Sequence, residues 1–329
     1  MVFLLDTLKR GLILIICCGE ALIDMVPVIS ESGQASYVPL VGGAIFNTSI
    51  GLGRLGVQVS MLSGISNDLF GQQLNQALID SKVDTSYLVR SNAPTTLAFV
   101  TLNAGNASYT FYDENSAGRS VETSDVPNLH QLQGNNNAVN TLYFGGISLI
   151  NEPAADTYCD LAHKYAADMV IVVDPNIRTN FINHEQNYRQ RLQSIISVAD
   201  IIKVSDQDLD WLVGNAHNEP QQVDLLRGTG KAIVVVTKGA DGATAYLSTG
   251  ETVHQDVPKV CVVDTVGAGD TFNAGLLAKL ASLGLLSKTE LQKIKPEKLL
   301  QSLAYAAQVA GVTVSRQGAN PPWLKDITT

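Results

Sequence analysis

Two acidic residues and two glycines lie within the segment DTVGAGDTF, residues 264–272, directly before a run of apolar residues. A Gly-Ala-Gly turn lets backbone N–H groups point outward, and a following helix start adds unpaired donors and a partial positive charge that attract an anion. Phosphoryl transfer to an alcohol needs such donors, together with a base that receives the hydroxyl proton. Asp270 would be that base.

The alternative is a purely structural role, in which Asp264 is a turn residue and Asp270 is a helix N-cap. The helix itself is predicted by apolar residues at helical spacing and a closing glycine, namely Phe272, Leu276, Leu280, Leu283 and Gly284. Asp270 would then lie inside the first turn rather than before it, where it is poorly placed as a simple cap.

The elements that must position this segment are predicted by short apolar runs that alternate with amphipathic stretches. The runs cover residues 12–17, 142–146, 169–174, 201–204 and 233–237. This alternation predicts βαβ units, and therefore an α/β fold with a doubly wound, mainly parallel sheet and helices on both faces. Ligands of such folds bind at the carboxyl ends of strands, where DPN (174–176) and VTKGADG (236–242) fall.

Two segments depart from this rhythm. Residues 35–43 and 95–119 alternate apolar and polar side chains, and a Gly-Asn pair at 105–106 predicts a turn. We expect them to form a small antiparallel sheet that acts as a lid. The prediction is one α/β domain over residues 11–329, with lid segments at about 32–43 and 95–119.

Composition restricts the class of partner and the compartment. The 329 residues carry a net charge of −9 and no Lys/Arg-rich run, which argues against nucleic acid. The four cysteines have no metal-binding spacing, so we expect reduced thiols and a cytoplasmic protein. Basic residues before the apolar run at 11–18 are also typical of a signal peptide, but the run is too short to span a membrane and suits a buried first strand.

Two nucleotide-binding patterns fail on context. GLGRLG (51–56) satisfies G-x-G-x-x-G, but no strand leads into it, and residues 45–55 are better explained as a helix that ends at Gly56. RGTGKA (227–232) lacks the first glycine and the Ser/Thr of a phosphate-binding loop.

DTVGAGDTF resembles the C-terminal signature of the ribokinase-like (PfkB) carbohydrate kinases, whose usual form is DTxGAGDxF. GEALIDM (19–25), VGGAIFNTSIGLGRLG (41–56) and, in part, GISNDLFG (64–71) resemble other motifs of this family in the same order. The resemblance covers nearly the whole chain. It implies a ribokinase-like fold and transfer of phosphate from ATP to a primary hydroxyl of a small sugar.

The resemblance also implies roles for residues that match the motifs. Asp270 would be the catalytic base, with an anion hole formed by Gly267, Ala268 and Gly269. Sugar hydroxyls would be bound by Asp24, Gly42, Gly43 and Asn47. The nucleotide would lie beside Lys203, Ser205, Thr237, Gly239 and Gly242. Arg178 would approach the phosphates or the phosphorylated end of the sugar, unless it is an ordinary surface arginine.

Metal binding is implied with one departure from the family pattern. The family often has N-x-x-E after the strand at 201–204, where the glutamate organises Mg²⁺ through water, and this chain has Ser205 and Asp208 instead. Aspartate is shorter but keeps the charge, so we expect Asp208 to act through water. A K⁺ ion could be held near the anion hole by Asp264, Val266 and Gly318.

The sugar acceptor is less specified than the reaction. GEALIDM, TTLAFVTL and YTFYDENSAGR resemble bacterial fructokinases most, which implies D-fructose and lid contacts from Tyr112, Asn115 and Arg119, unless these residues only follow strand alternation. A 2-keto-3-deoxygluconate kinase, a ribokinase and a non-catalytic sugar- or nucleotide-binding regulator stay as alternatives. Lid sheets of this family often pair across a homodimer, which is a further possibility here. No membrane partner is expected.

Overall fold

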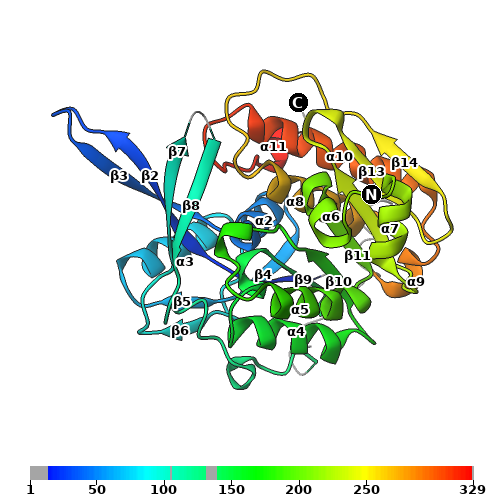
Figure 1. Cartoon of the computed structure of the whole chain (residues 1–329), viewed down its shortest axis with the longest axis horizontal. Helices are drawn as coiled ribbons and strands as arrows, with labels where there is room; N and C mark the ends of the chain where they lie inside the picture. The colour runs from blue at the N-terminus through cyan, green and yellow to red at the C-terminus, as the bar shows by residue number, and fades with distance from the viewer. Residues whose placement is uncertain (1–13, 104–105, 131–138, 328–329) are drawn as a thin grey trace, which may run out of the picture.

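A central β-sheet of eight strands forms the body of the molecule (Figure 1). The computed structural model describes residues 14–103, 106–130 and 139–327. The strands are β1 (Leu14–Cys18), β4 (Gln58–Leu62), β9 (Val139–Gly145), β10 (Val170–Asp174), β11 (Ile201–Ser205), β12 (Ile233–Thr237), β13 (Ala243–Tyr246) and β14 (Thr252–Gln255). Their order is β14-β13-β12-β11-β10-β9-β1-β4, parallel from β4 to β12 and antiparallel at the β13 and β14 edge. The predicted mainly parallel sheet is confirmed.

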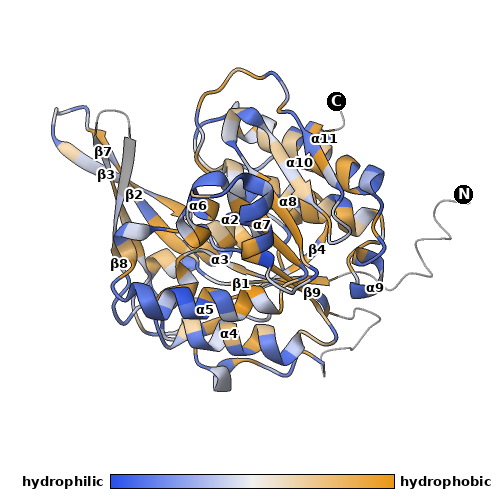
Figure 2. Cartoon of the chain, turned by 45° about the vertical axis from the view of Figure 1, so that its right-hand side comes forward, coloured by the Kyte–Doolittle hydropathy of each residue, from blue (hydrophilic) through white to orange (hydrophobic). Residues whose placement is uncertain are grey.

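Helices cover both faces of this sheet. They are α2 (Ala44–Arg54), α3 (Leu69–Asp80), α4 (Ala154–Tyr165), α5 (Glu185–Ser197), α6 (Asp206–Val213), α7 (Glu219–Arg227), α8 (Ala268–Ser282), α9 (Lys288–Leu291), α10 (Pro296–Val314) and α11 (Leu324–Ile327). Alternate residues of β1 enter two separate cores: Ile15 and Cys17 pack with α2, α3, α8 and α10, whereas Ile16 and Cys18 pack with α4 to α7. Because both faces are covered, the central strands of the sheet are mainly apolar (Figure 2), whereas the edge strand β14 is polar and partly exposed.

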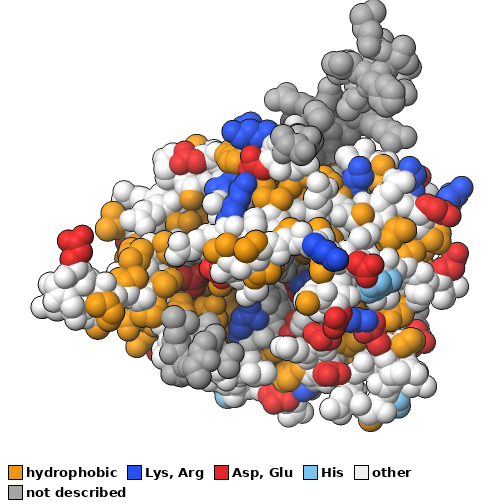
Figure 3. Space-filling view, turned by 90° about the horizontal axis from the view of Figure 1, so that it is seen from above, with side chains coloured by type: hydrophobic (Ala, Val, Ile, Leu, Met, Phe, Trp, Pro, Cys, Tyr) orange, Lys and Arg blue, Asp and Glu red, His pale blue; other side chains and the backbone are white. Residues whose placement is uncertain are grey.

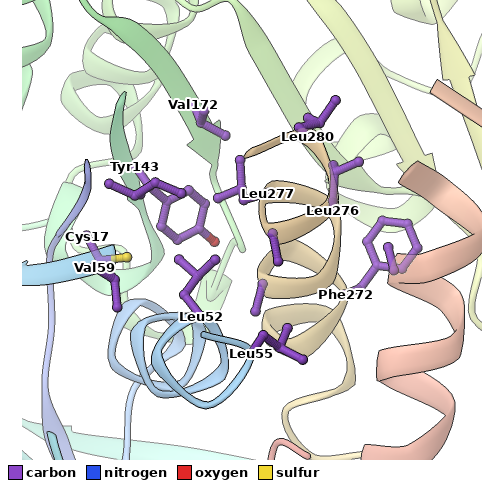
Figure 4. Packing of buried hydrophobic residues seen from close by; sticks show 14 of the residues in the cluster. Cys17, Leu52, Leu55, Val59, Tyr143, Val172, Phe272, Leu276, Leu277 and Leu280 are labelled. Carbon is purple, nitrogen blue, oxygen red and sulfur yellow. The ribbon is translucent and has the colours of Figure 1, made fainter. Parts of the chain in front are cut away.

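Helix α8, which carries Asp270, is buried between α2 and α10 (Figure 4). Two close approaches fix its position. A Cβ at Gly275 would lie 2.8 Å from the Ala306 Cα of α10, and one at Gly51 of α2 would lie 2.7 Å from the Ala274 Cβ. The helix predicted from residues 270–283 is therefore confirmed as a core helix, and its packing holds the first turn in place.

The lid is a second sheet, and it contains residues 22–29 in addition to the two predicted segments. Its strands are β2 (Leu22–Ile29), β3 (Ala35–Gly42), β7 (Leu97–Asn103) and β8 (Asn106–Tyr112), in the order β3-β2-β7-β8. The prediction of an antiparallel sheet is wrong for β2 and β7, which pair in parallel. Residues 113–119 form turns instead of strand, and Gly105 of the predicted turn lies outside the described residues. The sequence does not predict residues 22–29 as a lid strand, because their partners, residues 35–42 and 97–99, are set by tertiary contacts.

The remaining predictions about the body agree with the structure. The predicted first strand is β1, the predicted helix at 45–55 is α2, and Gly56 follows α2 with a φ of 81°. A small parallel pair, β5 (Gly64–Ser66) and β6 (Val89–Ser91), lies beside α3. All four cysteines are free thiols. In the described part of the chain, no helix combines the length and apolarity that a membrane crossing requires.

Candidate active site

A pocket of about 80 Å³ lies where the lid meets the carboxyl edge of the main sheet. Six residues predicted from the sequence line it together: Asp24, Gly43, Asn47, Arg178, Val266 and Asp270. They come from β2, the start of α2, the segment after β10, the loop before α8 and the first turn of α8. Segments far apart in the chain therefore bring carboxylates, an amide and a guanidinium to one small volume.

Asp270 is held firmly at the base of this pocket. The Asn47 side-chain amide donates a hydrogen bond of 2.9 Å to Asp270 Oδ2, and the Thr48 hydroxyl donates one of 3.2 Å to the Asp270 carbonyl oxygen. Burial raises the pKa of the Asp270 carboxyl to about 7, against the opposing effects of the Asn47 hydrogen bond and the nearby Lys203 and Arg178 charges. A carboxylate with a pKa near neutrality is well matched to accept a proton.

The turn before Asp270 requires glycine at its first position. Gly267 precedes α8 with a φ of 76°, and a Cβ there would lie 2.7 Å from the Ala319 Cβ. Helix starts leave several N–H groups without intrahelical partners. The Ala268 N–H, however, donates to the Thr265 carbonyl oxygen at 3.2 Å, which makes Ala268 the weakest of the three predicted anion-hole donors.

Asp24 and Arg178 both line the pocket, and their opposite charges interact. Burial raises the pKa of Asp24 to about 6, while the positive charge of Arg178 opposes that rise. Gly42 leaves room for this carboxylate, because a Cβ at Gly42 would lie 2.2 Å from Asp24 Oδ2. Although Arg178 is exposed, its guanidinium donates to the carbonyl oxygens of Asn176 and Ile177, and it lines the pocket.

A buried polar network that the sequence did not predict lies beneath α8. Lys203 Nζ donates to Asp174 Oδ2 at 3.0 Å, and the Asn273 amide donates to the same oxygen at 2.6 Å and to the Tyr143 hydroxyl at 2.8 Å. Burial opposes the charge of Lys203, but the Asp174 carboxylate outweighs it and raises the pKa of the lysine. A Cβ at Gly269 would lie 3.3 Å from Lys203 Nζ, so this charge lies directly under the predicted anion hole.

The predicted nucleotide residues lie at the neighbouring strand ends. Ser205 and Thr237 are paired residues at the carboxyl ends of β11 and β12. Gly239 and Gly242 follow β12 with φ values of 52° and 83°. None of these four lines the pocket that holds Asp24.

Asp208 lies in the first turn of α6 and forms a capping box with Ser205, the N-cap of that helix. Its N–H donates to the Ser205 hydroxyl at 3.0 Å, and its Oδ1 accepts from the Ile177 N–H at 3.1 Å. The side chain is buried, and burial together with the Asp174 charge raises its pKa. In the described residues, no group of three or more His, Cys, Asp or Glu side chains is arranged to hold a metal ion.

The three residues predicted to hold K⁺ lie together in the structure. Asp264 Oδ1 accepts from the Val266 N–H at 3.0 Å, and Oδ2 accepts from the Gly318 N–H at 2.9 Å. These bonds join the loop before α8 to the segment after α10. Val266 also lines the pocket.

The three predicted lid contacts, Tyr112, Asn115 and Arg119, do not line the pocket that holds Asp24 and Asp270. Tyr112 is 62% exposed and packs edge-on against Phe99 on the other face of the lid. Arg119 donates to the Glu152 carbonyl oxygen, and both it and Tyr112 line a neighbouring pocket, while Asn115 lines neither pocket. Side chains alternate along β8, and Tyr109 and Phe111 are the residues of this strand that line the pocket beside Asp24.

Glu20 is another pocket residue that the sequence analysis missed. Glu20 Oε1 accepts from the Ala44 N–H at 3.0 Å at the start of α2, and burial raises its pKa. The signal was present in GEALIDM, since an acid directly after a buried strand lies at the carboxyl edge of the sheet.

Comparison with known proteins agrees with this geometry. Residues 13–326 match the family model described as pfkB family carbohydrate kinase, and the chain belongs to that family. It is therefore an ATP-dependent sugar kinase, a phosphotransferase with an alcohol acceptor.

Individual relatives refine the comparison. The chain is 42% identical to a fructokinase of Rhizobium leguminosarum bv. trifolii over 286 residues, which are 87% of this chain and 85% of that protein. The crystal structure of fructokinase with bound ATP from Xylella fastidiosa matches with a TM-score of 0.86 and 26% identity, over 96% of this chain and 97% of that one. Aminoimidazole riboside kinase from Salmonella enterica, solved with aminoimidazole riboside and an ATP analogue, matches with a TM-score of 0.81 and 25% identity, over 96% and 98%.

Proposed function

We propose that this protein is a fructokinase, which transfers the γ-phosphate of ATP to a primary hydroxyl of D-fructose. The observation that carries the proposal is the Asp270 carboxylate, buried at the start of α8 and facing the same pocket as Asp24 and Arg178. The choice of fructose rests on the 42% identity to the Rhizobium enzyme.

Each residue of the pocket has a defined part in this proposal. The Asp24 carboxylate accepts hydrogen bonds from sugar hydroxyls, and the Asn47 amide can both accept hydrogen bonds from them and donate to them. Asp270 takes the proton from the attacking hydroxyl, which then attacks the γ-phosphorus in line. The N–H groups at the start of α8 and the Lys203 ammonium beneath them stabilise the charge on the transferred phosphoryl group. The lid covers the pocket and limits competition by water.

The test is ADP release from MgATP with D-fructose, D-ribose, 2-keto-3-deoxygluconate and no sugar. We expect Asp270→Asn to reduce fructose-dependent turnover by about 10²- to 10⁴-fold, since it keeps the shape of the side chain but cannot accept the proton. Asp160→Asn, at an exposed acid of α4, is the matched control. Near-full turnover in a folded Asp270→Asn variant would contradict the role of the base, and preference for another sugar would contradict the acceptor.

We further propose Mg²⁺ and K⁺ as the ions of this enzyme. Asp208 would hold Mg²⁺ through water, and the ion would neutralise charge on the ATP phosphates. Asp264, Val266 and Gly318 would hold K⁺ beside the start of α8. Turnover should fall when Mg²⁺ is chelated, and Asp264→Asn should weaken a dependence on K⁺ measured against Na⁺. Equal rates in both monovalent salts would reject the K⁺ site.

We also propose that the protein forms a homodimer through the lid. Only residues 23–25 of β2 pair with β7, so the ends of β2 and β3 project as a ribbon (Figure 1). Apolar side chains gather there, as Figure 3 shows, and several are exposed: Val28, Ile29, Tyr37, Val38 and Leu40. Such a patch on a free strand edge suits a second copy. Ile29→Asp should halve the mass measured by light scattering, whereas Leu225→Asp, at an exposed leucine of α7, should not.

A cytoplasmic location is the last part of the proposal. All four cysteines are free thiols, which suits a reducing compartment. Fractionation of cells that express the protein would test it.

A further inference from the structure

One aromatic side chain of the lid lies between two pockets. Phe111 lines the sugar pocket of about 80 Å³ and also a second pocket of about 560 Å³. The second pocket is bordered by acids, amides and an arginine, including Asp113, Asn151 and Arg119. The two volumes are neighbours, and Phe111 is the only side chain that borders both among the described residues.

Strand register explains why Phe111 faces the sugar. Asp24 of β2 pairs with Ala98 of β7, and Ala98 pairs with Phe111 of β8. Residues directly opposite one another in neighbouring strands share a face of the sheet. Asp24 faces the sugar pocket, so Phe111 faces it as well. Ala98, which is fully buried, has too small a side chain to separate the carboxylate from the ring.

Contacts from both the lid and the body hold the Phe111 ring. It stacks on Tyr109 of the same strand, with ring centroids 6.0 Å apart. From the body, Phe181 of the short 3₁₀ turn Thr179–Phe181 approaches to 4.7 Å between centroids. Phe181 lines the second pocket and lies three residues after Arg178. A ring held on two sides is a fixed wall rather than a freely rotating side chain.

We propose that Phe111 is the specificity-determining wall that limits the size of the acceptor. This inference rests on the proposed sugar kinase function and deepens it. With the ring in place, the pocket takes a small sugar and rejects a furanose that carries a second ring. Without it, the two pockets merge, and the polar groups of the second pocket can hydrogen-bond to a heterocyclic substituent.

Two acceptors that differ only in that substituent test the wall. D-Ribose and uridine both offer a primary hydroxyl on a ribose, and uridine adds a pyrimidine ring. We expect Phe111→Ala to raise the ratio of kcat/KM for uridine to that for D-ribose by about tenfold or more. Phe181→Ala, which frees the ring from one side, should raise the ratio less. Phe99→Ala removes an equal ring from the opposite face of the lid and should leave the ratio unchanged.

The same variants distinguish a wall at Phe111 from a general loosening of the lid. An unchanged ratio in a folded Phe111→Ala variant would overturn the proposal, as would an equal rise in Phe99→Ala, which would indicate a loosened lid. If Phe111→Ala does not fold, an unchanged ratio in Phe181→Ala would overturn it. Wild-type turnover with D-fructose tests the sugar kinase function separately. If wild type phosphorylates no sugar, calorimetric binding of uridine, stronger in Phe111→Ala than in Phe99→Ala, would still support the wall.

Discussion

Replacing Asp270 with asparagine should make the protein more stable while it removes activity. Burial raises the pKa of this carboxyl from its ordinary value of 3.8 to about 7. The folded state therefore holds a proton that the unfolded chain releases near pH 4. The stability contributed by that proton is fully present below pH 4 and is lost as the pH rises to about 7. Asparagine is neutral throughout this range and keeps an oxygen that can accept from Asn47.

The size of the effect follows from the shift in pKa. A shift of about three units, at about 1.4 kcal/mol per unit, amounts to about 4 kcal/mol once the carboxyl is ionised in both states. At pH 5 the folded protein still holds the proton, and the same relation gives a cost of about 2 kcal/mol. The stability advantage of Asp270→Asn over wild type should therefore increase by about 2–3 kcal/mol from pH 5 to pH 8.

Urea unfolding at pH 5, 6, 7 and 8, followed by circular dichroism, measures this difference directly. Asp160→Asn is the control, because an exposed acid of α4 should give no comparable pH-dependent gain. A free-energy difference between Asp270→Asn and wild type that stays constant from pH 5 to pH 8 would refute the reasoning. It would mean that the carboxyl titrates near its ordinary pKa and that its burial is relieved by water or by its neighbours.

Three further predictions concern the same site. The kcat/KM of wild type should rise with pH through a midpoint of about 7, because protonated Asp270 cannot act as a base; a flat pH–rate profile would contradict this. Lys203→Met should lower the free energy of unfolding by about 3–5 kcal/mol, since it leaves the Asp174 carboxylate buried and unpaired, and adding Asp174→Asn should recover part of the loss in urea unfolding. Gly267→Ala should cost about 1–2 kcal/mol for its left-handed backbone, with a further cost from the close approach to Ala319, and it should also reduce turnover; Gly250→Ala, at a φ of 90° in open space, should have only the backbone cost and leave turnover intact.

The body of the fold was predictable because its signals are local. Parallel strands buried on both faces must be largely apolar, and the runs at 233–237 and, apart from Lys203, at 201–204 show this without any partner. The start of α8 is likewise local, since the turn, Asp270 and the apolar spacing fall within twenty residues. The sequence alone therefore predicts Asp270 as a base, without knowledge of the pocket.

The lid could not be predicted in the same detail. When only one face of a strand is covered, the pairing register with the neighbouring strand decides which side chains lie on that face. A shift of one residue exchanges the two faces, and this is the difference between Tyr112, which the sequence predicts as a contact, and Phe111, which faces the pocket. Only the pairing of Asp24 with Ala98 and of Ala98 with Phe111 fixes that choice. Asp24 and Ala98 are more than seventy residues apart in the chain, so the local sequence of β8 does not indicate which of its faces lines the pocket.

The buried network shows a second limit, and it also explains how Asp270 can be both buried and useful. Asp174, Lys203 and Asn273 come from β10, β11 and α8, so no spacing in the sequence joins them. Asp174 raises the pKa of Asp270 and Lys203 lowers it, so the two charges of the ion pair oppose each other at the base. Desolvation by the packing of α8 then dominates, and the same packing that fixes the helix brings its first carboxylate close to neutrality. A looser helix would admit water, return that pKa toward 4 and weaken the base that the pocket needs at neutral pH.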